Sequence, residues 1–308
     1  MIPSFPKFAP LTFQNKDDYE RLVSGYPPLS DISFSSLQIW WNLDDQLSLS
    51  MIDDNIVINY RQSFDEINSG YCIIGETDLD NSIDRIFEYL SDRSELIKLV
   101  HVPEFVVKKI SNIDKYNLEE EIDYNEYILD SRALASLEDP LHGRTRRKVK
   151  RFLREVEDRK VEVKELDLSD PAIQKDLLET VTLWEGNKKS NNDPDSSELK
   201  AMKKTIQHGA NMGIVYLALY IDDKPYAVIL YHLSHDSNYY IIHHLKVDYS
   251  IPFIFDYVTH HIANRAAKED VNFLNMEMDL GIENMRRHKM GLRPVDFFRK
   301  YTITPNNK

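Results

Sequence analysis

The chain has 308 residues, 42% of them apolar and 11% aromatic, and carries a formal net charge of −13. This composition excludes a disordered polar chain, because such chains lack the apolar side chains that form a core. The single cysteine excludes a disulfide framework and a cysteine-based zinc site, and no window reaches the roughly 18 apolar residues of a membrane span. We therefore expect a folded cytoplasmic protein without a transmembrane segment, long enough for two packed domains.

The charges are divided unevenly along the chain. Residues 1–140 contain 11 Lys or Arg and 27 Asp or Glu, whereas residues 141–308 contain 27 and 24. We interpret 1–140 as an N-terminal half and 141–308 as a C-terminal half that carries the active cleft. An anionic partner is expected to bind the second half, because the first half would repel it.

The first half is predicted to contain both helices and strands. Pro27 and Pro28 end the first helix, since proline cannot continue it, and Ser33 can cap the second helix. A tight turn is expected at Asp53 and Asp54, between two strands. The expected elements are helices at 17–24 and 33–40, strands at 47–52, 56–60 and 70–75, a helix at 82–90, and strands at 96–100 and 121–129.

The second half begins with helices and continues as an antiparallel meander. Val149, Phe152, Leu153 and Val156 form one apolar stripe of a helix, and Gly209 is expected to end a later helix. The other expected elements are helices at 173–185 and 198–208, strands at 214–220, 226–233 and 239–247, a helix at 252–268, a strand at 273–278, a helix at 282–290 and a strand at 297–304. This order is the one found in the C-terminal part of the GNAT (acyl-CoA N-acyltransferase-like) fold.

Several segments stand in an order that is typical of one family. They are residues 26–37 with Trp40, residues 134–137 before an Arg/Lys-rich helix, residues 275–281, Arg286 with Lys289 and Pro294, and residues 300–303. On these residues the chain resembles the phosphatidylglycerol lysyltransferase C-terminal-domain family, including its soluble members.

The resemblance implies an α/β (α+β) fold of two GNAT-like halves in tandem, with mixed, mostly antiparallel sheets flanked by helices. It also implies kinship with Fem-type aminoacyltransferases, which pass an amino acid from charged tRNA to a lipid headgroup or peptide, and it implies no cofactor. The soluble members commonly carry an acidic residue where Leu245 stands, so lysyl transfer to phosphatidylglycerol is not predicted. The implied substrate-binding candidates are Tyr26, Asp31, Trp40, Lys246, Arg286 and Lys289.

Two carboxylates are candidates for the catalytic base. Glu277 and Asp279 are two residues apart on a predicted strand and so share a face, and a carboxylate beside a cleft can take a proton from an acceptor or hold its ammonium group. Asp279 and Arg286 are expected to line the same pocket. The alternative is that these carboxylates form structural ion pairs with Arg286 or Lys289.

His243 is a third candidate base. His243 and His244 are neighbours on a predicted strand, so we expect them to face opposite ways and not to bind one metal together. At most one faces the cleft, and the alternative is a histidine that is satisfied within the sheet. No metal site is predicted.

The helix that starts near residue 144 is strongly basic. Seven Lys or Arg residues lie within residues 144–154, and such crowding of like charge is unfavourable unless a partner neutralises it. Phosphates of a polyanion such as a tRNA acceptor stem would do so, and the alternative is a solvated face balanced by nearby acidic residues. The candidate contacts are Arg144, Arg146, Arg147, Lys150 and Arg151.

Together these features predict an acyl or aminoacyl transferase whose acceptor is an amine or hydroxyl of a small molecule, lipid headgroup or peptide. An acyl-CoA N-acyltransferase is the first alternative. It is disfavoured because no glycine occurs between Gly213 and Gly281, where a loop of backbone amides would hold the CoA pyrophosphate. The second alternative is a binding protein that keeps the fold without the chemistry.

Overall fold

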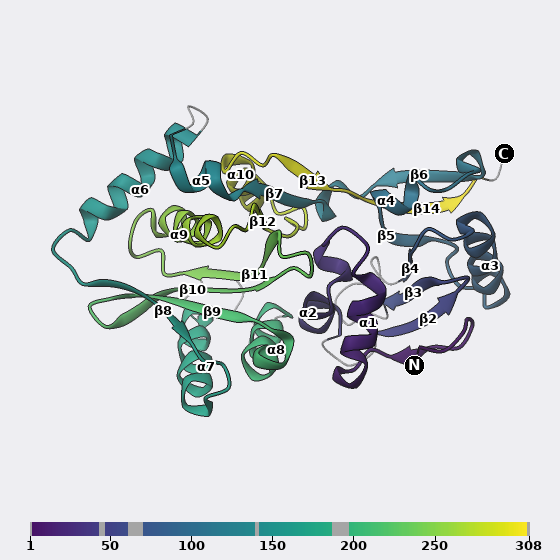
Figure 1. The fold of residues 1–308 in the computed structure, drawn as a ribbon, viewed down its shortest axis with the longest axis horizontal. Coiled ribbons are helices and arrows are strands. Elements are labelled where there is room, and N and C mark those ends of the chain that lie inside the picture. Colours follow the sequence, from purple (N-terminus) through teal and green to yellow (C-terminus); the bar gives the residue numbers. More distant parts are fainter. Residues whose placement is uncertain (1, 43–46, 61–69, 139–141, 187–196, 307–308) are drawn as a thin grey trace.

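A computed structural model describes residues 2–42, 47–60, 70–138, 142–186 and 197–306. Two seven-stranded sheets lie next to each other along the long axis of the molecule, each flanked by helices (Figure 1). Each sheet is antiparallel except for one parallel pair, β4 with β5 and β11 with β12. This is the tandem, mostly antiparallel α/β arrangement that the sequence predicts. Within the described segments no helix is both long and apolar enough to cross a membrane.

The first sheet is formed mainly by the N-terminal part of the chain. Its strands, in spatial order, are β1 (Ala9–Pro10), β2 (Ser48–Ile52), β3 (Asn55–Tyr60), β4 (Gly70–Ile74), β5 (Leu99–Pro103), β14 (Lys300–Pro305) and β6 (Tyr116–Glu120). The accompanying helices are α1 (Lys16–Val23), α2 (Phe34–Ser36), the π-helical turn η3 (Leu37–Trp41), α3 (Leu79–Asp92) and α4 (Glu104–Val107). Ser33 caps α2 as expected, because its hydroxyl accepts the Ser36 N–H.

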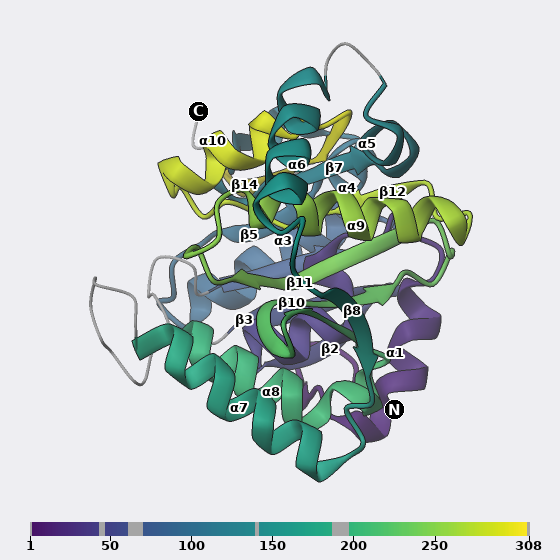
Figure 2. The same ribbon diagram turned by 90° about the vertical axis from the view of Figure 1, so that its left-hand side faces the viewer.

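The second sheet contains the predicted meander. Its strands, in spatial order, are β13 (Asp296–Phe298), β7 (Glu126–Asp130), β12 (Phe273–Asn275), β11 (Tyr239–Val247), β10 (Lys224–Leu233), β9 (Val215–Ile221) and β8 (Val161–Leu166). Its helices are α5 (Ser131–Ser136), α6 (Gly143–Glu155), α7 (Pro171–Gly186), α8 (Ser197–Met212), α9 (Ile254–Lys268) and α10 (Glu283–Gly291). Figure 2 shows β8 to β11 lying between α7 and α8 on one side and α6 and α9 on the other.

Two predicted strands differ from the structure where the chain passes between the sheets. The start of the expected strand 121–129 is wrong: β6 ends at Glu120 in the first sheet, a 3-10 turn spans Ile122–Tyr124, and only from Glu126 does the chain form β7 of the second sheet. The expected single strand 297–304 is wrong because it is divided at Arg299 into β13 of the second sheet and β14 of the first. The halves therefore exchange strands, and the boundary at residue 140 stays a prediction.

The helix α8 ends later than its sequence indicates. It passes through Gly209 and stops at Met212, where Gly213 takes a left-handed φ of 71°. Gly209 is small for a packing reason, since a Cβ there would lie 2.5 Å from the Leu168 Cδ1. The expected end of this helix at Gly209 is thus wrong, because α8 continues to Met212 and Gly213 is the glycine in the left-handed conformation.

The second sheet contributes side chains to two hydrophobic cores. Alternate residues of β9 point to opposite faces, so Tyr216 and Ala218 join a core that includes the first sheet and α8. Leu217 and Leu219 join a second core beneath α6 and α9. Because one face of the second sheet packs in the same core as the first half, the halves are not independent in their packing.

A buried ion cluster ties the last strand to both halves. Lys300 opens β14 and its side chain is fully buried, with its Nζ bonded to the Asp31 carboxylate and 2.8 Å from the Glu126 Oε1. Burial alone would lower the pKa of Lys300, but Asp31 and Glu126 outweigh it and hold the pKa above its ordinary value. Lys300 is therefore charged, and the cluster depends on it.

We predict that Lys300→Ala lowers the free energy of unfolding by about 3–5 kcal/mol, because it leaves two buried carboxylates without their cation. Urea denaturation monitored by circular dichroism measures the change. Lys115→Ala is the matched control, since Lys115 forms an exposed pair with Asp84, and it should unfold with the wild-type midpoint. Equal midpoints for both variants would contradict the assigned role of Lys300.

Candidate active site

The candidate site lies where the parallel strands β11 and β12 separate. Their pairing ends at Ile241 and Asn275, after which the chain beyond β12 turns toward β7 and the Met276 N–H donates to the Tyr127 carbonyl. On the other strand, His243 has no partner in β10, because Leu230 pairs with His244 and Tyr231 with Ile242. Such a β-bulge redirects a side chain, and bulges are common beside active sites.

Four polar side chains from three parts of the chain meet at this bulge. The His243 Nδ1 lies 2.9 Å from the Glu277 Oε1 and 3.3 Å from the Ser36 Oγ. The Ser36 hydroxyl lies 3.4 Å from the same Glu277 oxygen. On its far side, the His243 Nε2 lies 2.7 Å from the His232 Nδ1. The predicted candidates Glu277 and His243 are thus brought together, and Ser36 and His232 are added to them.

Glu277 is held in an unusual backbone conformation. Its φ is 54°, in the left-handed region that costs about 1 kcal/mol or more for a residue with a side chain. Lys289 supports this bend, because its ammonium group donates to the main-chain carbonyls of Met276, Glu277 and Met278 at 2.7, 3.3 and 2.5 Å. Lys289 therefore positions the segment that presents Glu277.

Burial sets the protonation of the cluster. It raises the pKa of Glu277 well above its ordinary value, and the negative charge of Glu126 raises it further. It also lowers the pKa of His243 to about 3 and that of His232 well below its usual range. Burial therefore favours the uncharged forms of all three groups, and for Glu277 this is the protonated carboxyl.

The cluster adjoins the ions around Lys300. Asn275 donates to the Glu126 Oε2 at 2.5 Å through its side chain and accepts the Glu277 N–H at 2.9 Å. Glu126 also accepts the Ser30 N–H and hydroxyl. Asp31, a predicted substrate-binding residue, is buried with Lys300 and accepts the Trp41 indole N–H at 3.2 Å. Asp31 is thus a partner of this buried cation.

The expected opposite orientation of His243 and His244 is wrong. Both reach the same helical segment, because His243 contacts Ser36 in α2 while His244 packs on Trp40 in η3 with ring centroids 4.8 Å apart. The bulge at His243 breaks the two-residue alternation on which the expectation rested. The His244 Nε2 also lies 3.0 Å from the Thr205 Oγ1. Among the described residues, no group of three or more metal-ligating side chains is assembled.

Asp279 and Arg286 are bound to each other. The Arg286 Nε and Nη2 both lie 2.8 Å from carboxylate oxygens of Asp279, whose side chain is fully buried. Asp279 also accepts the Tyr127 hydroxyl and the Gly281 N–H. Burial acts to raise the pKa of Asp279, but Arg286 and Tyr127 outweigh it and hold that pKa low. With four donors around its carboxylate Asp279 resembles a structural clamp, and its catalytic role stays a prediction.

The other predicted contacts are dispersed. Tyr26 stacks on Phe105 in the first half with ring centroids 5.1 Å apart, and Lys246 forms an ion pair with Glu198 of α8. The roles of Tyr26 and Lys246 in substrate binding remain predictions.

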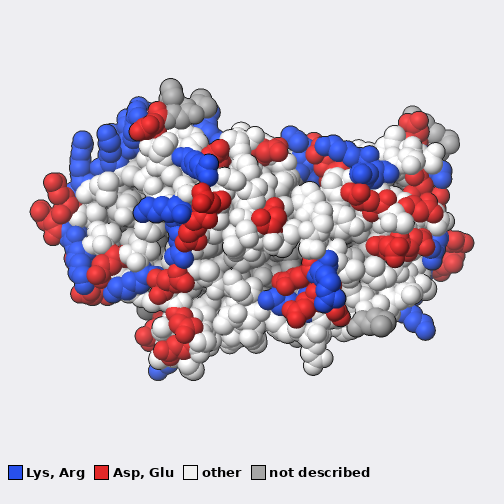
Figure 3. All heavy atoms as spheres, viewed as in Figure 1, with Lys and Arg blue, Asp and Glu red and all other residues white. Residues whose placement is uncertain are grey.

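The basic residues gather along α6, where blue side chains project at the upper left of Figure 3. Lys148 is paired with Asp256, Arg146 donates to the Leu137 carbonyl, and Arg151 lies over the Phe253 ring. The exposed members that have neither an ion pair, a side-chain hydrogen bond nor an aromatic contact within the described part of the chain are Arg144, Arg147, Lys150 and Arg154.

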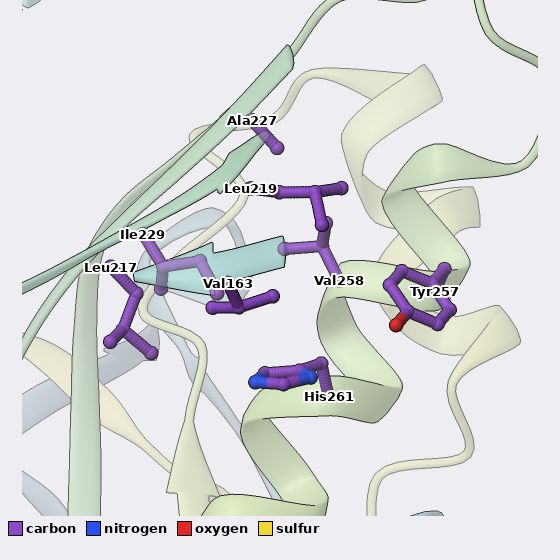
Figure 4. Close-up of a pocket in the computed structure, with 8 residues that line it drawn as sticks. All are labelled: Val163, Leu217, Leu219, Ala227, Ile229, Tyr257, Val258 and His261. Carbon is purple, nitrogen blue, oxygen red and sulfur yellow. The ribbon is translucent and has the colours of Figure 1, made fainter. Parts of the chain in front are cut away.

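A small apolar hollow lies elsewhere, between the second sheet and α9 (Figure 4). Its volume is about 10 Å³, room for one water molecule. The hollow faces α9, whereas His243 faces α2, and none of the predicted site residues lines it. Its lining residues are Val163, Leu217, Leu219, Ala227, Ile229, Tyr257, Val258 and His261.

We predict that Glu277→Gln removes a pH-dependent loss of stability. Because the pKa of Glu277 is raised by folding, the unfolded state releases a proton that the native state keeps, and stability falls as pH rises between the two pKa values. The variant should gain in free energy of unfolding over wild type as pH rises above the ordinary glutamate pKa of about 4.3. Urea denaturation at a series of pH values measures the gain. Glu119→Gln, at an exposed residue of β6, is the control, and parallel curves for Glu277→Gln and wild type would contradict the assignment.

Comparison with known proteins agrees with the resemblance seen in the sequence. A conserved protein of unknown function from Bacteroides thetaiotaomicron has a TM-score of 0.81 at 21% identity, over 99% of this chain and 100% of that chain. L-PGS from Bacillus licheniformis has a TM-score of 0.63 at 12% identity, over 100% and 94%, and FemX has a TM-score of 0.56 at 8% identity, over 98% of both chains.

These likenesses show a shared fold, and no curated protein matches the sequence. The family is shown by a model described as the C-terminal part of phosphatidylglycerol lysyltransferase, which matches residues 29–304. Because this match spans most of the chain, the protein belongs to the phosphatidylglycerol lysyltransferase C-terminal family.

Proposed function

We propose that this protein is an aminoacyltransferase that moves an amino acid from aminoacyl-tRNA to an amine or hydroxyl acceptor. Family and fold relate it to aminoacyl transferases such as lysylphosphatidylglycerol synthase and FemX. The observation that carries the proposal is the buried pair of Glu277 and His243 at the point where β11 and β12 separate. This pair gives the fold a group that can exchange a proton with a substrate.

The reaction requires one bond to form and one to break. The acceptor nitrogen or oxygen attacks the ester carbonyl of the donor and loses a proton, and the bond from that carbonyl to the ribose oxygen breaks as the ribose oxygen takes up a proton from water. The Glu277 Oε1 faces His243 and Ser36, whereas Oε2 makes no hydrogen bond to any described residue and the side chain keeps 10% exposure. Oε2 is therefore the atom that we assign to the acceptor proton.

The basic helix supports a tRNA donor. Its unpaired cations are exposed, and α6 lies at the end of the second half away from the first sheet (Figure 1). Arginines and lysines in such an arrangement bind phosphates and release counterions. The junction between β11 and α9 contains no glycine, which disfavours a CoA pyrophosphate cradle there. Acyl-CoA is accordingly the competing donor in the experiment.

We predict donor consumption when the protein is incubated with mixed aminoacyl-tRNA and a panel of amine and phospholipid acceptors. Glu277→Gln should lower the rate by about 100-fold or more, because the amide cannot take the acceptor proton. Release of radiolabelled amino acid from tRNA measures the rate, with Glu119→Gln as the control. Consumption of acyl-CoA alone would show that acyl-CoA, and not aminoacyl-tRNA, is the donor. Consumption of neither donor would reject transferase activity with the donors tested.

We also predict that Arg147→Ala, Lys150→Ala and Arg154→Ala together weaken tRNA binding and flatten its dependence on salt. Each lost phosphate contact should reduce the slope of log affinity against log salt by about 0.7 to 0.9. Filter binding at several salt concentrations measures the slope. The control is a triple alanine variant of the exposed lysines Lys108, Lys109 and Lys115 in the first half, and equal slopes for the two variants would remove α6 from the proposal.

A further inference from the structure

His232 extends the Glu277 and His243 pair toward solvent. It lies on β10, is partly exposed, and its ring is parallel to that of His243 within 7°. Its Nδ1 is 2.7 Å from the His243 Nε2, while its Nε2 makes no hydrogen bond to any described residue. The three side chains therefore form one line of hydrogen bonds from a buried carboxyl to a partly exposed imidazole.

We propose that His243 and His232 form a relay that carries the acceptor proton from Glu277 to solvent. The inference rests on the proposed function and adds His232 and a direction of proton movement to it. A neutral imidazole suits this role, because one ring nitrogen accepts a proton while the other donates one. His232 does not touch the substrate in this scheme and is a positioning residue.

The hydrogen bonds define two states of the relay. In the first, the Glu277 Oε1 donates to the His243 Nδ1, the His243 Nε2 donates to the His232 Nδ1, and the outer His232 Nε2 carries a proton. In the second, Glu277 is ionised and both histidines carry their proton on Nδ1. Each imidazole must change tautomer when the relay changes state, because each nitrogen in the line has a fixed partner.

One proton enters and one leaves in each passage. The acceptor gives its proton to the Glu277 Oε2 as Oε1 passes its own proton to the His243 Nδ1. In the same concerted step the His243 Nε2 gives its proton to the His232 Nδ1, and the His232 Nε2 gives one to water. Glu277 is then a neutral acid protonated on Oε2, and both histidines carry their proton on Nδ1 without having become charged. Return of both imidazoles to the Nε2 tautomer and of the Glu277 proton to Oε1, with no net gain or loss of protons, restores the first state before the next passage.

The charged surroundings of the line differ at its two ends. Lys16 of α1 and His235 influence His232 and oppose an added positive charge there. Lys289, Glu126, Asp31 and Lys300 influence Glu277, with Glu126 and Asp31 disfavouring its ionised form. A charged intermediate is therefore unfavourable at either end, which suits a concerted transfer through neutral groups.

Nitrogen NMR of the histidine side chains tests the relay without requiring activity. In the wild-type protein we expect both His232 and His243 to carry their proton on Nε2 near neutral pH. As pH is raised through the ionisation of Glu277, both should change to Nδ1 together, with one common midpoint. In Glu277→Gln both should keep the proton on Nε2 at every pH, since the amide donates to the His243 Nδ1.

Separate midpoints for the two histidines, or a His232 tautomer that does not follow Glu277, would overturn the relay. A kinetic test uses His232→Gln, whose amide can accept the hydrogen bond from His243 but cannot pass a proton on. Transfer should slow by about 10-fold or more with tRNA affinity unchanged, and imidazole should restore activity to His232→Ala. Full activity in both variants would overturn the relay, whereas no donor consumption by the wild type would reject the proposed function alone.

Discussion

The structure depends on a buried positive charge held between carboxylates from different parts of the chain. Lys300 binds Asp31, which precedes α2, and Glu126 at the start of β7. Because one ammonium group does not neutralise two carboxylates, further donors are needed, and Ser30, Asn275 and Trp41 supply them. This cluster fixes β14 in the first sheet and β7 in the second, and thereby locks the exchange of strands.

The same cluster controls the candidate site. Burial, together with the negative charge of Glu126, raises the pKa of Glu277 and so favours its protonated carboxyl. The strand β7, which begins at Glu126, also holds the backbone around Glu277. The Tyr127 carbonyl accepts the Met276 N–H, and the Tyr127 N–H donates to the Glu277 carbonyl. The electrostatics and the geometry of the site therefore have a common origin in β7.

Several conspicuous charged residues serve to support this geometry. Lys289 donates hydrogen bonds to main-chain carbonyls, and Arg286 binds the Asp279 carboxylate through two N–H groups. Burial lowers the pKa of Lys289 to about 8, but its position under the Glu277 segment explains its presence without a substrate. The cations of α6 differ, because several of them face solvent without a partner among the described residues. The protein thus combines a largely buried cluster of Glu277 and two histidines with an exposed, positively charged helix.

The sequence by itself determined the meander, the basic helix and the identity of Glu277 and His243 as candidates, because apolar periodicity and side-chain chemistry are local properties. Only the tertiary structure decided that His243 lies in a bulge and that Arg299 divides a strand between two sheets. Neither feature changes the alternation of apolar and polar residues from which a strand is predicted. Ser36 and His232 were missed because a serine or histidine gains its role from its partners, and Ser36 is separated from His243 by 207 residues. Periodicity predicts which face of an element is buried, but only the tertiary structure determines which residues that face contacts.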